Sequence, residues 1–70
     1  MKKEQNNSFV KEQITHALLS LMKHHPFEDI TITEIVKHAL VSRASFYRNF
    51  INKEDILKQH LVKLIQEWGT

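Results

Sequence analysis

The most distinctive chemistry in this 70-residue sequence lies in residues 42–50, which could place hydrogen-bonding side chains in a polar groove. Phe46 and Phe50 lie four residues apart, so they would share the inward face of a helix. The opposite face would then carry small and hydrogen-bonding side chains, namely Ala44, Ser45 and Arg48. An arginine can form two hydrogen bonds to guanine, and a serine hydroxyl can bond to a base or a phosphate. The segment therefore indicates a short helix suited to the groove of a nucleic acid.

Positive charge is concentrated around this segment. Residues 35–53 contain Lys37, Arg43, Arg48 and Lys53 and no acidic residue, whereas the rest of the chain has more acidic than basic side chains. The formal net charge is only +2, so the positive face lies on a nearly neutral body. Such a face can attract phosphate. Charge alone, however, would favour an ordinary solvated helix face.

The helix with this surface needs other elements to hold it, and apolar periodicity predicts four helices and an all-α fold. The first is expected at residues 8–24, where six apolar residues form one stripe. Ser8 would cap its start, Lys23 and two histidines would fill its last turn, and Pro26 would end it.

Two short helices joined by a tight turn are expected over residues 31–50. Thr31 and Glu34 have the spacing of a capping box at the start of the second helix. Ser42 is the expected N-cap of the third helix, with Phe46 on its buried face. Two caps so close together define two successive short helices.

Asn52 is the expected N-cap of a fourth helix, and Ile51 and Ile56 have the spacing of a hydrophobic staple around it. Packing against the first helix is expected for three leucines of the fourth, Leu57, Leu61 and Leu64. Trp68, close to the end of the chain, suggests a surface that another element covers.

Several function classes are excluded or disfavoured by composition. Without cysteine the chain can have neither disulfides nor thiolate metal sites, and its five histidines lack the spacing of a metal site. A single glycine excludes a P-loop and a dinucleotide fingerprint, and there is no triad-like arrangement. We therefore expect no enzyme activity, no cofactor and no metal. The absence of a spanning segment and of a signal peptide predicts no membrane association and a cytoplasmic protein.

Four stretches of the sequence together resemble the N-terminal DNA-binding domain of the tetracycline-repressor-like (TetR/AcrR) transcriptional regulators. They are KHHPFEDI, TITEIV, VSRASFYRNF and NKEDIL, and the resemblance extends from about Phe9 to Trp68. It implies a homeodomain-like three-helix bundle whose helix-turn-helix lies at about 31–50, plus a fourth C-terminal helix. The expected organisation is a flexible arm at residues 1–7 and the DNA-binding domain at 8–70. The family's ligand-binding and dimerisation domain is expected to be absent from this chain.

The resemblance also implies which residues contact DNA. Arg43 and Ser45 would read bases, and Tyr47 and Lys53 would bind phosphates. The full expected set is Thr31, Thr33, Ser42, Arg43, Ala44, Ser45, Tyr47, Arg48, Asn49 and Lys53. Two positions depart from the family pattern. Leu40 stands where the family often has glycine, and a positive φ there would cost about 1 kcal/mol or more. Asn49 stands where the family often has histidine.

The implied function is sequence-specific binding of double-stranded DNA by a transcriptional regulator, with a repressor favoured over an activator. A full-length protein would bind a pseudo-palindromic operator as a homodimer, and a small-molecule effector would require a C-terminal domain. The alternative is a small helical module that binds another protein through its apolar faces and does not bind DNA.

Overall fold

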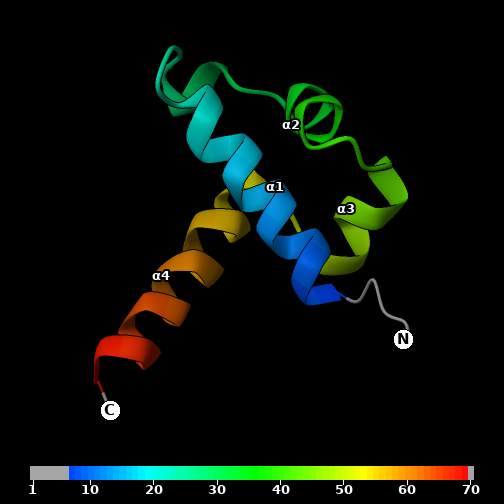
Figure 1. Cartoon of the computed structure of the whole chain (residues 1–70). Helices are drawn as coiled ribbons and strands as arrows, with labels where there is room; N and C mark the ends of the chain where they lie inside the picture. The colour runs from blue at the N-terminus through cyan, green and yellow to red at the C-terminus, as the bar shows by residue number, and fades with distance from the viewer. Residues whose placement is uncertain (1–6, 70) are drawn as a thin grey trace.

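The computed structural model describes residues 7–69 of the chain, which contain helices and no strand (Figure 1). The elements are α1 (Asn7–Leu21), a short 3-10 helix η1 (Phe27–Asp29), α2 (Ile32–Ala39), α3 (Arg43–Asn49) and α4 (Lys53–Gly69). The all-α prediction with four helices is confirmed. Apart from Asn7, the arm expected at residues 1–7 lies outside the described residues.

Helix α1 is displaced from its expected bounds at both ends. It begins at Asn7, so Ser8 lies inside the helix and is not its N-cap. It ends at Leu21, and the amides of Lys23 and His24 bond to carbonyls three residues back, at 3.2 and 3.1 Å. Pro26 disfavours the helical conformation for His25, the residue before it, so the helix cannot continue through this point. The basic residues therefore occupy the turn that follows the helix and not the last turn of α1.

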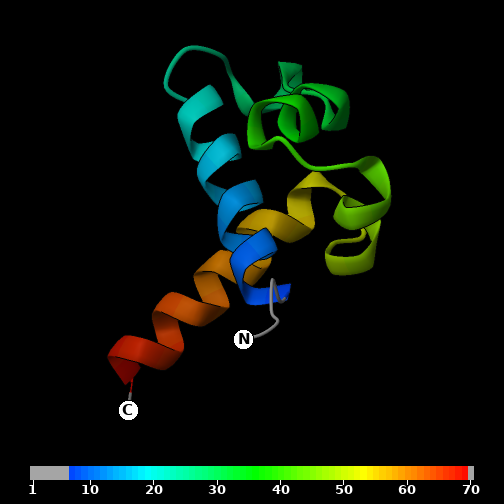
Figure 2. The same ribbon diagram turned by 45° about the vertical axis from the view of Figure 1, so that its right-hand side comes forward.

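The core forms where α1 crosses the other three helices, as Figures 1 and 2 show from two directions. Its largest fully buried side chains come from every helix and from the connector. They are Ile14, Leu18, Ile30, Ile35, Phe46 and Ile56. Because all four helices contribute to this one core, the core fixes α2 and α3 relative to α1. A substitution that leaves a cavity at any of these positions would be costly.

The start of α2 has the predicted capping box. The Thr31 hydroxyl accepts a hydrogen bond from the Glu34 amide at 3.1 Å, and the Glu34 carboxylate accepts one from the Thr31 amide at 2.9 Å. These two bonds satisfy amides that a helix start leaves without partners. The position at which α2 begins was therefore correctly predicted.

The turn between α2 and α3 requires a left-handed residue, and that residue is Leu40, with φ 62° and ψ 42°. The Val41 amide bonds to the Val36 carbonyl at 3.1 Å, which closes the end of α2 as in a Schellman motif. Leu40 itself is 88% exposed. A branched residue thus adopts the conformation for which glycine is best suited.

Helix α4 begins as predicted, because Asn52 Oδ1 accepts a hydrogen bond from the Asp55 amide at 2.9 Å. The expected staple is not formed: Ile56 is fully buried but Ile51 is 78% exposed. Instead the Ile51 amide donates to the Asp55 carboxylate at 2.9 Å.

The second half of α4 is more exposed than the first half. Leu57 lies against the core, as expected. Leu61 is 58% exposed, so the prediction that it packs on α1 is wrong, whereas Leu64, 38% exposed, lines a cleft together with Lys11 and Glu12 of α1. The second half of α4 runs away from α2 and α3 (Figures 1 and 2), and Lys63 reaches α1 through an exposed ion pair with Glu12.

Candidate nucleic-acid interface

Two aromatic side chains anchor α3 in the domain: Phe46 lies within the helix, whereas Phe50, expected on the same helical face, is the extended residue that follows it. Phe46 is fully buried and Phe50 nearly so, with their ring centroids 5.7 Å apart. At the start of the helix, the Ser42 hydroxyl accepts a hydrogen bond from the Ser45 amide at 3.0 Å, as expected of an N-cap. The seven residues of α3 are thus held at both ends.

The other side of α3 faces outward and is basic. Four of the predicted DNA-contacting residues are exposed there, namely Arg43, Ala44, Tyr47 and Arg48. Tyr47 is 52% exposed, and its ring meets that of Phe46 edge to face at 5.2 Å. Its ring is therefore held by packing while more than half of the side chain stays accessible.

Arg43 and Thr33 bring the starts of α2 and α3 together. Arg43 Nη1 donates a hydrogen bond to Thr33 Oγ1 at 2.7 Å, although the two residues are ten positions apart. Both side chains are exposed, so the bond lies on the surface of the helix-turn-helix. The guanidinium therefore has a defined position before any ligand binds.

Ser45 and Asn49 form a second contact along α3. Asn49 Nδ2 donates to the Ser45 carbonyl at 2.8 Å, and the Ser42 hydroxyl donates to Ser45 Oγ at 3.2 Å. Asn49 Oδ1 is buried and has no hydrogen-bond partner among residues 7–69. The Asn49 amide is therefore directed into the domain and away from the exposed face.

Gln59, which the sequence analysis did not single out, supports the end of α3 from α4. Its Nε2 donates to the Asn49 carbonyl at 3.2 Å and to Asp55 Oδ2 at 3.1 Å. A glutamine within an amphipathic helix gives no sequence signal for such a role, because its partner is a backbone carbonyl ten residues away.

Lys53, the first residue of α4, is also turned into the protein. Its ammonium donates to the carbonyls of Phe27, Ile30 and Glu28, at 2.7, 2.8 and 3.3 Å. The same nitrogen lies 4.6 Å from the centroid of the Phe27 ring. Thr31, beside this connector, uses its hydroxyl in the capping box, although the side chain is exposed.

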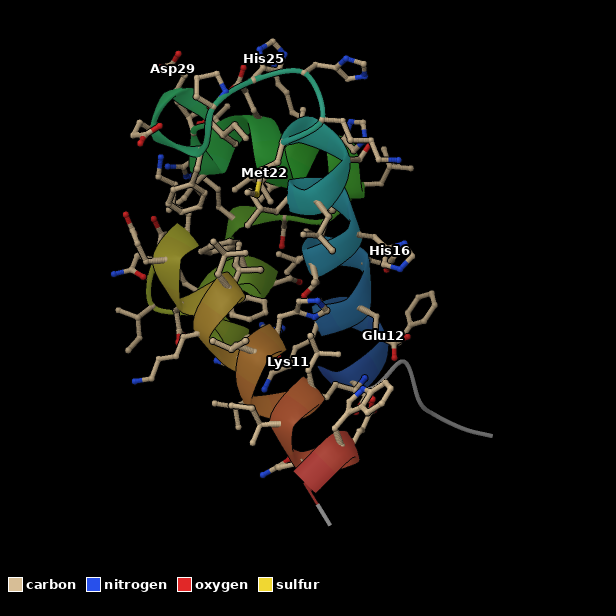
Figure 3. The ribbon with its side chains drawn as sticks, turned by 90° about the vertical axis from the view of Figure 1, so that its left-hand side faces the viewer. Lys11, Glu12, His16, Met22, His25 and Asp29 are labelled. Carbon is tan, nitrogen blue, oxygen red and sulfur yellow. The ribbon has the colours of Figure 1, made fainter. Side chains whose placement is uncertain are left out.

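Histidine and carboxylate side chains are spread over the domain. Glu12 and His16 project from the outer side of α1, and His25 and Asp29 lie at the far end, beyond the last turn of α1 (Figure 3). In the part of the chain that the structure describes, no three such residues gather as metal ligands would. None of the helices in that part is long and apolar enough to cross a membrane.

Residues 14–59 match the family of bacterial regulatory proteins, tetR family. The match begins in α1, contains all of α2 and α3, ends in α4 and covers more than half of the chain. No curated protein and no solved structure matches the chain. Given this match over the whole helix-turn-helix, the chain belongs to the tetR family of bacterial regulatory proteins, a family of DNA-binding transcription regulators.

Proposed function

We propose that this domain binds double-stranded DNA sequence-specifically by inserting α3 into the major groove, and that it acts as a transcriptional repressor. The observation that carries the proposal is the two-sided character of α3. One side is fixed by buried Phe46 and Phe50, and the other presents exposed Arg43 and Arg48. A rigid helix with such an outer face has the dimensions and donors that the major groove accepts.

Arg43 and Ser45 are the proposed base readers, and Ala44 lies between them. Arg43 can donate two hydrogen bonds to guanine O6 and N7, which is worth about 1–3 kcal/mol of discrimination. The small Ala44 allows close approach of the helix, and its methyl group can meet that of a thymine. The bond from Arg43 to Thr33 supports this role, because a guanidinium already held in place loses less freedom on binding.

Phosphate contacts are proposed for the exposed residues that flank α3. The Tyr47 hydroxyl and the Arg48 guanidinium suit this role, as do the hydroxyls of Thr31, Thr33 and Ser42. Such contacts set the position of the helix without selecting a sequence. Asn49 and Lys53 are proposed to support the helices and not to contact DNA, since Asn49 Nδ2 and Lys53 Nζ donate to backbone carbonyls of the protein.

Two copies of α3 would be needed for a long recognition site. A two-fold homodimer of a longer protein would place them about 34–36 Å apart on a pseudo-palindromic operator. The repressor function would follow from occupation of that operator, in the cytoplasm where bacterial DNA lies. A small-molecule effector would bind a further domain.

A protein-binding module is the second candidate, and the exposed apolar residues of α4 favour it. Leu61 is 58% exposed and Trp68 is 85% exposed, with Ile65 on the same stretch of helix. Unlike contacts with phosphate, apolar contacts release no counterions. The two functions therefore predict different responses to salt.

The test is a binding titration with a pool of random DNA duplexes at several salt concentrations. DNA binding through α3 predicts that the logarithm of the binding constant falls linearly as the logarithm of salt concentration rises. A chain that binds no duplex at low salt would refute the proposal and leave the protein-binding function.

A further inference from the structure

The ammonium of Lys53 bridges two segments that are far apart in the sequence. Lys53 begins α4, whereas its three carbonyl acceptors belong to Phe27, Glu28 and Ile30 in the connector between α1 and α2. An ammonium has three N–H donors, and three carbonyls lie within hydrogen-bond distance of this one. The Phe27 ring adds a cation–π contact on the same group.

The position of this lysine is unusual for a helix start. The first turn of a helix favours negative charge, and Glu54 and Asp55 follow that preference. A positive charge at Lys53 is unfavourable there unless other dipoles compensate for it. The connector carbonyls provide that compensation, because their negative ends converge on the ammonium.

The connector leads directly into α2. Ile30, whose carbonyl Lys53 binds, is buried in the core and precedes Thr31, the N-cap of α2. The Ile30 amide in turn bonds to the Phe27 carbonyl at 3.1 Å and closes a turn. The Lys53 ammonium bonds to the carbonyls at both ends of this turn. The position of the α2 start, and with it Thr33, therefore depends on this contact.

We propose that Lys53 is a positioning residue, which fastens the connector to the start of α4 and so fixes α2 against α3, and that it is not a phosphate ligand. The consequence for DNA rests on the proposed function, whereas the fastening itself is a property of the free protein. The two parts can be tested separately.

The first test uses the wild-type chain and needs no variant. Trace acetylation at neutral pH is followed by mass spectrometry. It compares the acetylation rate of Lys53 with that of Lys58, an exposed lysine of the same helix. Lys53 should react severalfold more slowly, because its nitrogen is surrounded by carbonyls and the Phe27 ring. Equal reactivity of the two lysines would refute the fastening.

The second test compares Lys53→Met with Lys58→Met, which removes the same charge from the surface of α4. Amide hydrogen exchange of Asp29 and Ile30, which bond within the connector, should accelerate about tenfold in Lys53→Met and stay unchanged in Lys58→Met. Unchanged exchange in Lys53→Met would contradict the proposal. If Lys53→Met fails to fold, the acetylation rates of the wild-type chain decide whether Lys53 fastens the connector.

Binding to DNA then separates positioning from phosphate binding. A positioning residue predicts that Lys53→Met lowers affinity by a similar factor at every salt concentration. Loss of a phosphate ligand would instead reduce the slope of log K against log salt by about 0.9, and that result would overturn the assignment. Failure of the wild-type chain to bind DNA would refute the proposed function, while acetylation and exchange would still decide whether Lys53 holds the connector.

Discussion

Replacing Leu40 with glycine should stabilise this domain, although it removes a large apolar side chain. Leu40 has φ 62° and ψ 42°, a left-handed conformation that costs a residue with a Cβ about 1–2 kcal/mol. Because the side chain is 88% exposed, its removal sacrifices little buried area. Glycine has more conformational freedom in the unfolded chain, and this entropy cancels about 0.5–1 kcal/mol of the stabilisation gained by removing the strain. The expected net gain in the free energy of unfolding is therefore about 0.5–1 kcal/mol.

Thermal unfolding followed by far-UV circular dichroism measures this gain. For a domain of this size, about 0.5–1 kcal/mol corresponds to a rise in Tm of roughly 2–8 °C. Leu40→Ala is the matched control, because alanine removes the side chain but keeps the Cβ that makes the left-handed conformation costly. The control should change stability little. A Leu40→Gly variant no more stable than Leu40→Ala would refute the strain argument.

Three other substitutions test the caps and the proposed DNA contacts. Thr33→Val removes the acceptor for Arg43, and we expect a severalfold loss of DNA affinity with weaker base preference and an unchanged Tm. Tyr47→Phe should lower affinity for all duplexes alike, because the hydroxyl is proposed to contact phosphate; a loss confined to one sequence would contradict that role. Asn52→Ala removes the N-cap of α4 and should cost about 1 kcal/mol in denaturant unfolding, whereas an unchanged midpoint would show that the cap contributes nothing.

Helix starts were predictable where the decisive interactions are local. The capping box of Thr31 and Glu34 and the caps at Ser42 and Asn52 all join residues three positions apart. The buried face of α3 was predictable for the same reason, since helical periodicity alone places Phe46 on it.

Other features depend on how the helices meet, which periodicity does not encode. Leu61 and Leu64 continue the apolar stripe of α4, yet their side chains are 58% and 38% exposed. The contacts of Lys53 were hidden because their acceptors are backbone carbonyls, which every residue type possesses. The inward turn of the Asn49 side-chain amide likewise depends on a backbone carbonyl, that of Ser45.

The exposed end of α4 is a feature that the DNA-binding proposal does not use. Leu61, Ile65 and Trp68 give it a largely apolar surface, and Lys63 forms only an exposed ion pair with Glu12 at 3.4 Å. Such a surface ion pair contributes little to stability.

The central claim is that α3 selects a DNA sequence through Arg43, and selection of bound duplexes from a random pool tests it most directly. The wild-type chain should enrich one short motif that contains a guanine read by Arg43. Arg43→Ala should lose the preference at that position, with a drop in discrimination of roughly 5–150-fold, while neighbouring positions keep theirs. Enrichment of the same motif with the same affinity by Arg43→Ala, or of no motif by the wild type, would contradict the claim.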